Sequence, residues 1–160
     1  MRPLPLGLVV ALSTFVADQA LKLWIVFVYD LAARGRVEVL PFLDLVMVWN
    51  RGISYGLFQQ DSGIGRLVLL GISLIACVLL VVWLRRENSG LAAVAIGLIL
   101  GGAAGNGVDR AAYGAVADFV LLHAGGFEWY VFNIADAAIV VGVALLLYGA
   151  LLQNGRTEEA

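Results

Sequence analysis

Four long apolar runs, separated by more polar segments, organise this chain. They cover residues 4–28, 67–84, 91–108 and 134–152, and each reaches the roughly 17–25 residues that a helix needs to cross a bilayer. The pattern predicts four transmembrane helices in a single integral-membrane domain over residues 1–160. Because the number of spans is even, both termini lie on one side of the membrane, and the two long connections lie on the other.

The first long connection, after residue 28, has a different pattern. Val37–Leu40 and Leu43–Trp49 are rich in β-branched and aromatic residues and partly alternate, which is typical of short strands. Open strand edges cannot lie in hydrocarbon, so these strands should lie at the membrane surface. The predicted fold class is an α-helical membrane protein, with four transmembrane helices and a small β-element in the outer connection.

Composition and charge support a membrane protein and exclude several functions. The chain is 62% apolar and only 14% charged, against roughly 45–50% apolar for soluble domains. A single cysteine, Cys77, and a single histidine, His123, provide neither a disulfide framework nor a metal-binding cluster, so we expect no metal and no cofactor. A net charge of −2 without a basic cluster gives no reason to expect nucleic acid.

Arginines are densest around the termini and the 85–90 turn, which predicts cytoplasmic termini.

Acidic residues interrupt the apolar pattern where they are expensive to keep. The second long connection covers residues 109–133. Asp109 begins it, Asp118 lies in its loop, and Asp136 follows it. The parity of the spans brings three asparagines to the same outer face: Asn50, Asn106 and Asn133. Two adjacent carboxylates cannot both ionise, so one keeps its proton and the other acts as a base. That is the logic of aspartic peptidases, but chemistry alone does not say which two of the three aspartates form the pair.

Polar and small residues in the helices also have purely structural explanations. Asp18 and Lys22 are four residues apart and can form an ion pair on one helix face, although Asp18 could instead line a polar cavity. The glycines at 97, 101 and 105 follow the spacing that lets membrane helices approach closely. This spacing predicts that the third helix packs tightly against a neighbour.

Structural explanations exist for the outer acids too. Asp109 could pair with Arg110 at a helix end, and Asn133 could cap the fourth helix with Asp136 in its first turn. A transporter is the competing function, because intramembrane acids also relay protons. However, Asp136 lies only about 3 Å of helix rise inside its run, far from the midplane. A third possible function is that of a scaffold, in which the acids only pair with arginines.

Five short blocks resemble, in order, those of the lipoprotein signal peptidases, the bacterial type II signal peptidases. The blocks are Asp18–Lys22, Asn50–Gly56, Gly101–Arg110, Val116–Phe119 and Phe132–Asp136. The resemblance covers nearly the whole chain, including the layout of four spans. The chain departs from the family at Ser54-Tyr55, where small and larger aromatic residues are commoner. It departs again at Gly107, where a bulkier apolar residue is usual.

The resemblance implies an intramembrane aspartyl endopeptidase of the bacterial inner membrane. Its substrates would be diacylglyceryl-modified prolipoproteins, cleaved just before the lipidated cysteine. By position, Asp118 and Asp136 correspond to the catalytic pair, with Asp18 and Lys22 in a supporting motif. The positions implied for substrate binding are Asn50, Gly52, Asn106, Asp109, Arg110 and Asn133. It further implies membrane lipid as a partner, inhibition by the cyclic peptide globomycin, and an active site on the periplasmic face. We expect a monomer.

Overall fold

The computed structural model describes residues 3–52 and 63–158, so Ser54 and Tyr55 lie outside the described residues. The helices are α1 (Pro3–Leu23), which continues into the π-helical turn η1 (Trp24–Val28), α2 (Leu31–Arg34), α3 (Gly63–Arg86), α4 (Gly90–Tyr113) and α5 (Ile134–Glu158). The strands are β1 (Val37–Leu40), β2 (Leu43–Asn50), β3 (Val116–Ala124) and β4 (Phe127–Glu128). A small sheet therefore accompanies a helical bundle.

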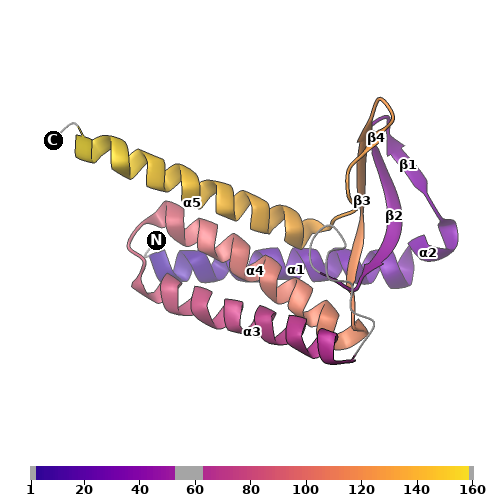
Figure 1. The fold of residues 1–160 in the computed structure, drawn as a ribbon, viewed down its shortest axis with the longest axis horizontal. Helices are drawn as coiled ribbons and strands as arrows, with labels where there is room; N and C mark the ends of the chain where they lie inside the picture. Colours follow the sequence, from indigo (N-terminus) through magenta and orange to yellow (C-terminus); the bar gives the residue numbers. More distant parts are fainter. Residues whose placement is uncertain (1–2, 53–62, 159–160) are drawn as a thin grey trace.

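Four of the described helices are long and apolar enough to cross a membrane: Pro3–Val28, Ile64–Arg86, Gly90–Tyr113 and Ile134–Leu152. Each contains one of the apolar runs, so the predicted fold class is confirmed. The sheet lies at the end of the bundle where α4 ends and α5 begins, and both chain termini lie at the opposite end (Figure 1). The arrangement agrees with the parity argument from the sequence.

Helix α4 is the centre of the bundle, in contact with α1, α3 and α5. Its glycines make this close packing feasible. A Cβ added at Gly97 would lie 2.5 Å from the carbonyl oxygen of Gly7 on α1, and one at Gly101 would lie 2.5 Å from that of Ala11. No side chain fits at such distances, so the prediction of tight packing by small residues is correct.

The sheet is antiparallel throughout, with the strand order β1-β2-β3-β4 in the described residues. Strands β1 and β2 lie where the sequence predicted them. A small core of Ile25, Leu31 and Phe119 joins the sheet to η1 and α2. This core anchors β3 at the end of the bundle, because Phe119 is completely buried in the middle of that strand.

Two local predictions were wrong. Asp118 does not lie in a loop: it is a residue of β3 and pairs in register with Val48 of β2. Asp109 does not begin the second outer connection either, because α4 continues through it to Tyr113 and ends at Gly114, whose φ of 76° is left-handed. Glycine adopts that conformation at little cost, which explains where the helix stops.

Candidate active site

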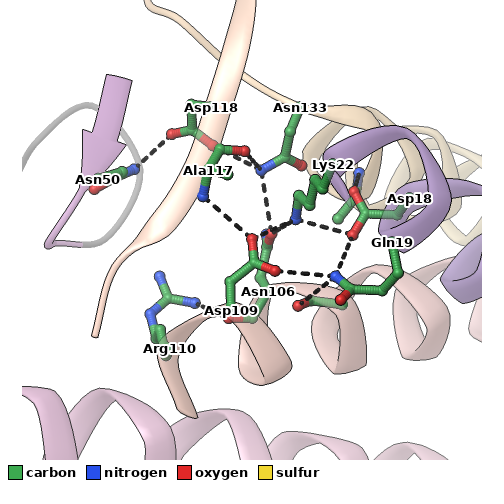
Figure 2. Close-up of polar contacts among 12 residues, drawn as sticks. Asp18, Gln19, Lys22, Asn50, Asn106, Asp109, Arg110, Ala117, Asp118 and Asn133 are labelled. Carbon is green, nitrogen blue, oxygen red and sulfur yellow. Dashed lines mark hydrogen bonds and ion pairs between the residues drawn. The ribbon is translucent and has the colours of Figure 1, made fainter. Parts of the chain in front are cut away.

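Asp118 is fixed by two side-chain amides at the end of the bundle. Its carboxylate is only 2% exposed. Asn133 Nδ2 donates to Oδ1 at 2.6 Å, and Asn50 Nδ2 donates to Oδ2 at 3.0 Å (Figure 2). The antiparallel pairing of β2 with β3 brings Asn50 and Asp118 together across 68 residues of sequence.

Asp136 is held by the first turn of α5. Asn133 caps this helix: its Oδ1 accepts from the N–H of Asp136 at 2.9 Å, and its own N–H donates to Oδ2 of Asp136 at 3.3 Å. This reciprocal pair is a capping box, which confirms the predicted cap. A third donor, Asn106 Nδ2, reaches Oδ1 of Asp136 at 2.8 Å. Asn133 therefore bonds to both carboxylates, since Asp118 accepts from its side chain.

The three asparagines around these acids have amide orientations that their other partners dictate. Asn50 Oδ1 accepts from the N–H of Gly52 at 3.0 Å, and Asn133 Oδ1 accepts from the N–H of Asp136. Asn106 Oδ1 accepts from Lys22 Nζ at 3.0 Å. An ammonium or a backbone N–H can only donate, so each asparagine must turn its NH₂ group the other way. In each case that group meets Asp118 or Asp136.

Asp18, Lys22 and Asp109 form a second set of charges beside the first, and we call these three residues the lysine cluster. Lys22 Nζ lies 2.9 Å from Asp18 and 2.8 Å from Asp109, with all three side chains at most 4% exposed. The ion pair predicted between Asp18 and Lys22 is thus present. Asp109, for which a pair with Arg110 was considered, pairs with Lys22 of α1.

The lysine cluster connects the elements of the site. Asp18 Oδ1 accepts from the N–H of Ala135 at the start of α5 at 3.0 Å. Asp109 Oδ2 accepts from the N–H of Ala117 on β3 at 3.1 Å. These bonds fix the backbone next to Asp136 and next to Asp118, so the cluster positions both acids.

The sequence reading missed Gln19, which completes the lysine cluster. Its Nε2 donates to Asp18 at 3.1 Å, to the carbonyl of Gly105 at 3.3 Å and to Asp109 at 3.0 Å. The available signal was a further polar residue inside the first apolar run, directly beside Asp18. Its partners on α4 lie up to 90 positions away, beyond the reach of helical spacing.

Asp118, Asp136 and their three asparagines form what we call the amide cluster. The pKa of Asp118 is raised to about 7, first by burial and second by the nearby charge of Asp136. The hydrogen bonds from Asn50 and Asn133 act in the opposite direction, because they stabilise the charged carboxylate. The Asp118 carboxyl group therefore exchanges its proton near neutral pH.

A hollow of about 200 Å³ opens beside Asp136, and its polar lining consists of Asn50, Ser73, Asn106, Arg110 and Asp136. Arg110 donates to the carbonyl of Gly52 at 3.0 Å and to the carbonyl of Asn106 at 3.3 Å. Its Nε is buried and has no hydrogen-bond partner among the described residues. We call this hollow the polar cavity. It joins a carboxylate, amides and an unused donor, which suits a peptide.

Every site residue named from the sequence thus lies in this region. The amide cluster holds Asn50, Asn106, Asp118, Asn133 and Asp136. The lysine cluster holds Asp18, Lys22 and Asp109. Arg110 and Gly52 bond to each other at the edge of the polar cavity.

Comparison with known proteins identifies the family. The family model described as signal peptidase (SPase) II matches residues 10–152, so the chain belongs to the signal peptidase II family and is a peptidase. With its four apolar helices, it is a multi-pass membrane protein. This result excludes the transporter and the scaffold considered from the sequence.

Similar proteins agree with this assignment. The chain is 55% identical to a lipoprotein signal peptidase of Nitrobacter hamburgensis over 158 residues, which cover 96% of each chain. It is 54% identical to one of Methylobacterium sp. strain 4-46 over 160 residues, covering 100% of this chain and 97% of that one. A bacterial membrane enzyme of solved structure superposes with a TM-score of 0.84 at 27% identity, covering 96% of this chain and 92% of that chain.

Proposed function

We propose that this peptidase removes the signal peptide from diacylglyceryl-modified prolipoproteins, cleaving before the lipidated cysteine, with Asp118 and Asp136 as its catalytic pair. The observation that carries the pair is their common attachment to Asn133, which donates to Asp118 from its side chain and to Asp136 from its backbone. The names of the relatives, lipoprotein signal peptidases, support the substrate class.

The two acids have different surroundings, which supports different roles. Asp136 lies in the first turn of α5 and accepts a backbone N–H there, where the helix dipole favours a negative charge. Asn106, which donates to it, is itself bonded to the ammonium of Lys22. Asp118 lies on a strand without a helix terminus, and its pKa is raised to about 7. In our proposal Asp136 is the base and Asp118 holds the proton.

In the first chemical step, Asp136 takes a proton from a water molecule, and the oxygen of that water attacks the scissile carbonyl carbon. Asp118 gives its proton to the carbonyl oxygen, and the result is a neutral gem-diol. In the second step, the gem-diol returns a proton to Asp118 while Asp136 protonates the leaving nitrogen, and the C–N bond breaks. One water is consumed, and both acids regain their starting protonation states.

The polar cavity supplies binding groups for the peptide. Arg110 Nε, which has no hydrogen-bond partner among the described residues, would donate to a substrate carbonyl there. Asn50 and Gly52 would border the peptide on the β2 side, since both belong to the segment that Arg110 holds in place. Asn106 and Asn133 would keep the acids in position rather than bind substrate.

The span pattern and the family support one cellular arrangement. We propose that the chain lies in the bacterial inner membrane with cytoplasmic termini, so that the sheet and both acids face the periplasm. The termini and the sheet lie at opposite ends of the bundle (Figure 1), as this orientation requires. A monomeric enzyme and competition by globomycin complete the proposal.

A cleavage assay with purified enzyme in one type of bilayer tests the proposal. The wild type should cut a diacylglyceryl-modified lipoprotein precursor and cut the same unlipidated precursor very poorly, because misplacement of about 1 Å can cost roughly 100-fold in rate. Comparable cleavage of both precursors would refute the lipid requirement. Substantial activity in a folded Asp118→Asn or Asp136→Asn enzyme would refute the catalytic pair.

A further inference from the structure

A second hollow, between α3 and α4, adjoins the polar cavity. Its volume is about 320 Å³, and its lining is almost entirely apolar, with Leu70, Leu74 and Cys77 from α3 and Ala104, Gly107 and Ala111 from α4. We call it the acyl groove. Ser73 and Ala103 line both hollows, so the groove begins where the wall of the polar cavity ends.

From this geometry we infer that the acyl groove receives one acyl chain of the lipid-modified substrate. This inference rests on the proposed function, because the substrate carries an acyl chain beside the scissile bond only if its cysteine is lipidated. A peptide bond held at Asp136 leaves the modified cysteine side chain beside the polar cavity. Its acyl chains must then reach the hydrocarbon, and the adjoining groove is an apolar route.

The chemistry of the lining favours an acyl chain over a polar occupant. The hydroxyl of Ser73 donates to the carbonyl of Leu69 in its own helix at 3.0 Å, so its donor is already used. A whole helix is about 10–12 Å across with its side chains and does not enter a hollow of about 320 Å³. The signal helix of the substrate is therefore too wide for this groove, whereas a single acyl chain is narrow enough.

Gly107 sets the depth of the groove. Other glycines of α4 serve helix packing, since an added Cβ would lie 2.5 Å from a backbone carbonyl oxygen of α1 at Gly101 and of α5 at Gly102. A Cβ at Gly107 would meet only Ser73 Cβ, at an ordinary 3.5 Å. Close packing does not require this glycine. The missing side chain leaves room that the occupant can fill, at the position where the family resemblance implies a bulkier residue.

The groove would act by placing the chain rather than by attracting it. An acyl chain in the bilayer is already surrounded by hydrocarbon and gains little hydrophobic free energy from an apolar protein surface. What a fitted groove adds is packing and a fixed direction for the chain. A fixed chain determines the depth and orientation of the scissile bond, so the effect should appear in kcat/KM.

The test compares a filled groove with a matched control. Gly107→Leu places a large side chain in the groove. Gly149→Leu is the control, because an added Cβ at Gly149 also meets a single side-chain atom at 3.5 Å, far along α5 from the site. The substrates are two lipopeptides with the same signal sequence, one carrying palmitoyl chains and one carrying butyryl chains on the diacylglyceryl group.

We expect Gly107→Leu to lower kcat/KM at least about 10-fold for the palmitoyl substrate, since misplacement of about 1 Å can cost roughly 100-fold. It should leave the butyryl substrate within about twofold, and Gly149→Leu should leave both unchanged. An equal loss for both substrates would overturn the inference, because it would show damage to the active site or contact with the signal helix. Equal behaviour of the two leucine variants would overturn it too.

Labelling of Cys77 gives a second measurement that does not depend on cleavage. Cys77 is the only cysteine in the chain and lines the groove, so a lipid-soluble maleimide reports on its occupancy. In the Asp118→Asn variant, the palmitoyl substrate should slow labelling several-fold and the butyryl substrate should not. If neither substrate slows the labelling of Cys77, bulk lipid fills the groove and the inference is refuted. If the proposed function fails, the wild type cleaves neither substrate, which is a separate result.

Discussion

The lysine cluster and the amide cluster lie side by side, contain two aspartates each, and keep them buried in different ways. In the lysine cluster, the ammonium of Lys22 pairs directly with Asp18 and Asp109. In the amide cluster, the donors to Asp118 and Asp136 are neutral amides. Asn106 belongs to both, because it accepts from Lys22 and donates to Asp136.

Under the proposed function, this difference separates a structural use of carboxylates from a chemical one. An ion pair fixes the charge of both partners, because neutralising either one leaves the other charge buried and unpaired, which is costly. Neutral amides orient a carboxylate without dictating its charge, so a proton can move on and off. The raised pKa of Asp118, about 7, is what such surroundings produce. The first cluster should therefore matter for folding and the second for the reaction.

The largest expected effect is on activity, from changes in the amide cluster. Asp118→Asn and Asp136→Asn should each lower kcat about 10³-fold or more, because general acid–base catalysis contributes roughly 10²–10⁴-fold. Neither should unfold the protein, since the asparagine keeps one acceptor oxygen and each lost hydrogen bond to a charged carboxylate is worth about 1.5–3 kcal/mol. The measurements are turnover of a lipidated precursor and the thermal unfolding midpoint in detergent.

The contrast between the two clusters requires both outcomes, a large loss of turnover and an unfolding midpoint that is retained. If the asparagine variants lose activity only in proportion to lost folded protein, the amide cluster is structural like its neighbour. Glu87→Gln is a matched control, because it neutralises an acid in the α3–α4 turn at the opposite end of the bundle. It should change neither turnover nor the unfolding midpoint appreciably.

The second largest effect is on stability, from the lysine cluster. Lys22→Met leaves Asp18 and Asp109 buried without their cation and should cost about 3–5 kcal/mol of unfolding free energy. Combining it with Asp18→Asn and Asp109→Asn removes the unpaired charges and should recover much of the loss. Chemical or thermal unfolding of the detergent-solubilised protein measures both. Arg85→Met, an exposed change in the last turn of α3, should stay within about 0.5 kcal/mol.

The contacts behind these two predictions differ in how well the sequence alone predicts them. Local spacing was sufficient for the pair of Asp18 with Lys22 and for the cap that Asn133 places on α5, because both lie within one helical turn. The bond of Lys22 to Asp109 joins α1 to α4. No periodicity encodes such a contact, so the existence of the lysine cluster could not be predicted.

The strand that carries Asp118 was missed for a related reason. Residues 116–119 at the start of β3 are all buried, so apolar and polar positions do not alternate and the period of a strand is hidden. Pairing with β2 across 68 positions then decides the conformation. By contrast, β1 and β2 have exposed positions and a visible pattern, and they were predicted correctly.

The third effect tests Asn106, the link between the clusters. Asn106→Asp keeps an acceptor for Lys22 but replaces the donor to Asp136 with a repelling oxygen. Loss of a charge-assisted hydrogen bond, about 1.5–3 kcal/mol, should lower kcat roughly 10- to 100-fold with little change in the unfolding midpoint. Asn88→Asp, which adds the same charge on an exposed turn, is the control. A large fall in stability without a fall in kcat would place Asn106 with the lysine cluster alone.

The smallest effect is a shift in the pH profile, and it tests the division of roles within the amide cluster. Asp118 must be protonated to act as the acid, so kcat/KM should fall as pH rises through about 7, the pKa of Asp118. Asn50 donates to the charged form and holds that pKa down. In Asn50→Ala the alkaline limb should therefore move to higher pH, by about one unit for a hydrogen bond of this kind. Ser73→Ala, in the same cavity but bonded to its own helix, should leave the limb in place. Movement of the acidic limb instead would show that Asp118 is the base, and would reverse the roles assigned to the two acids.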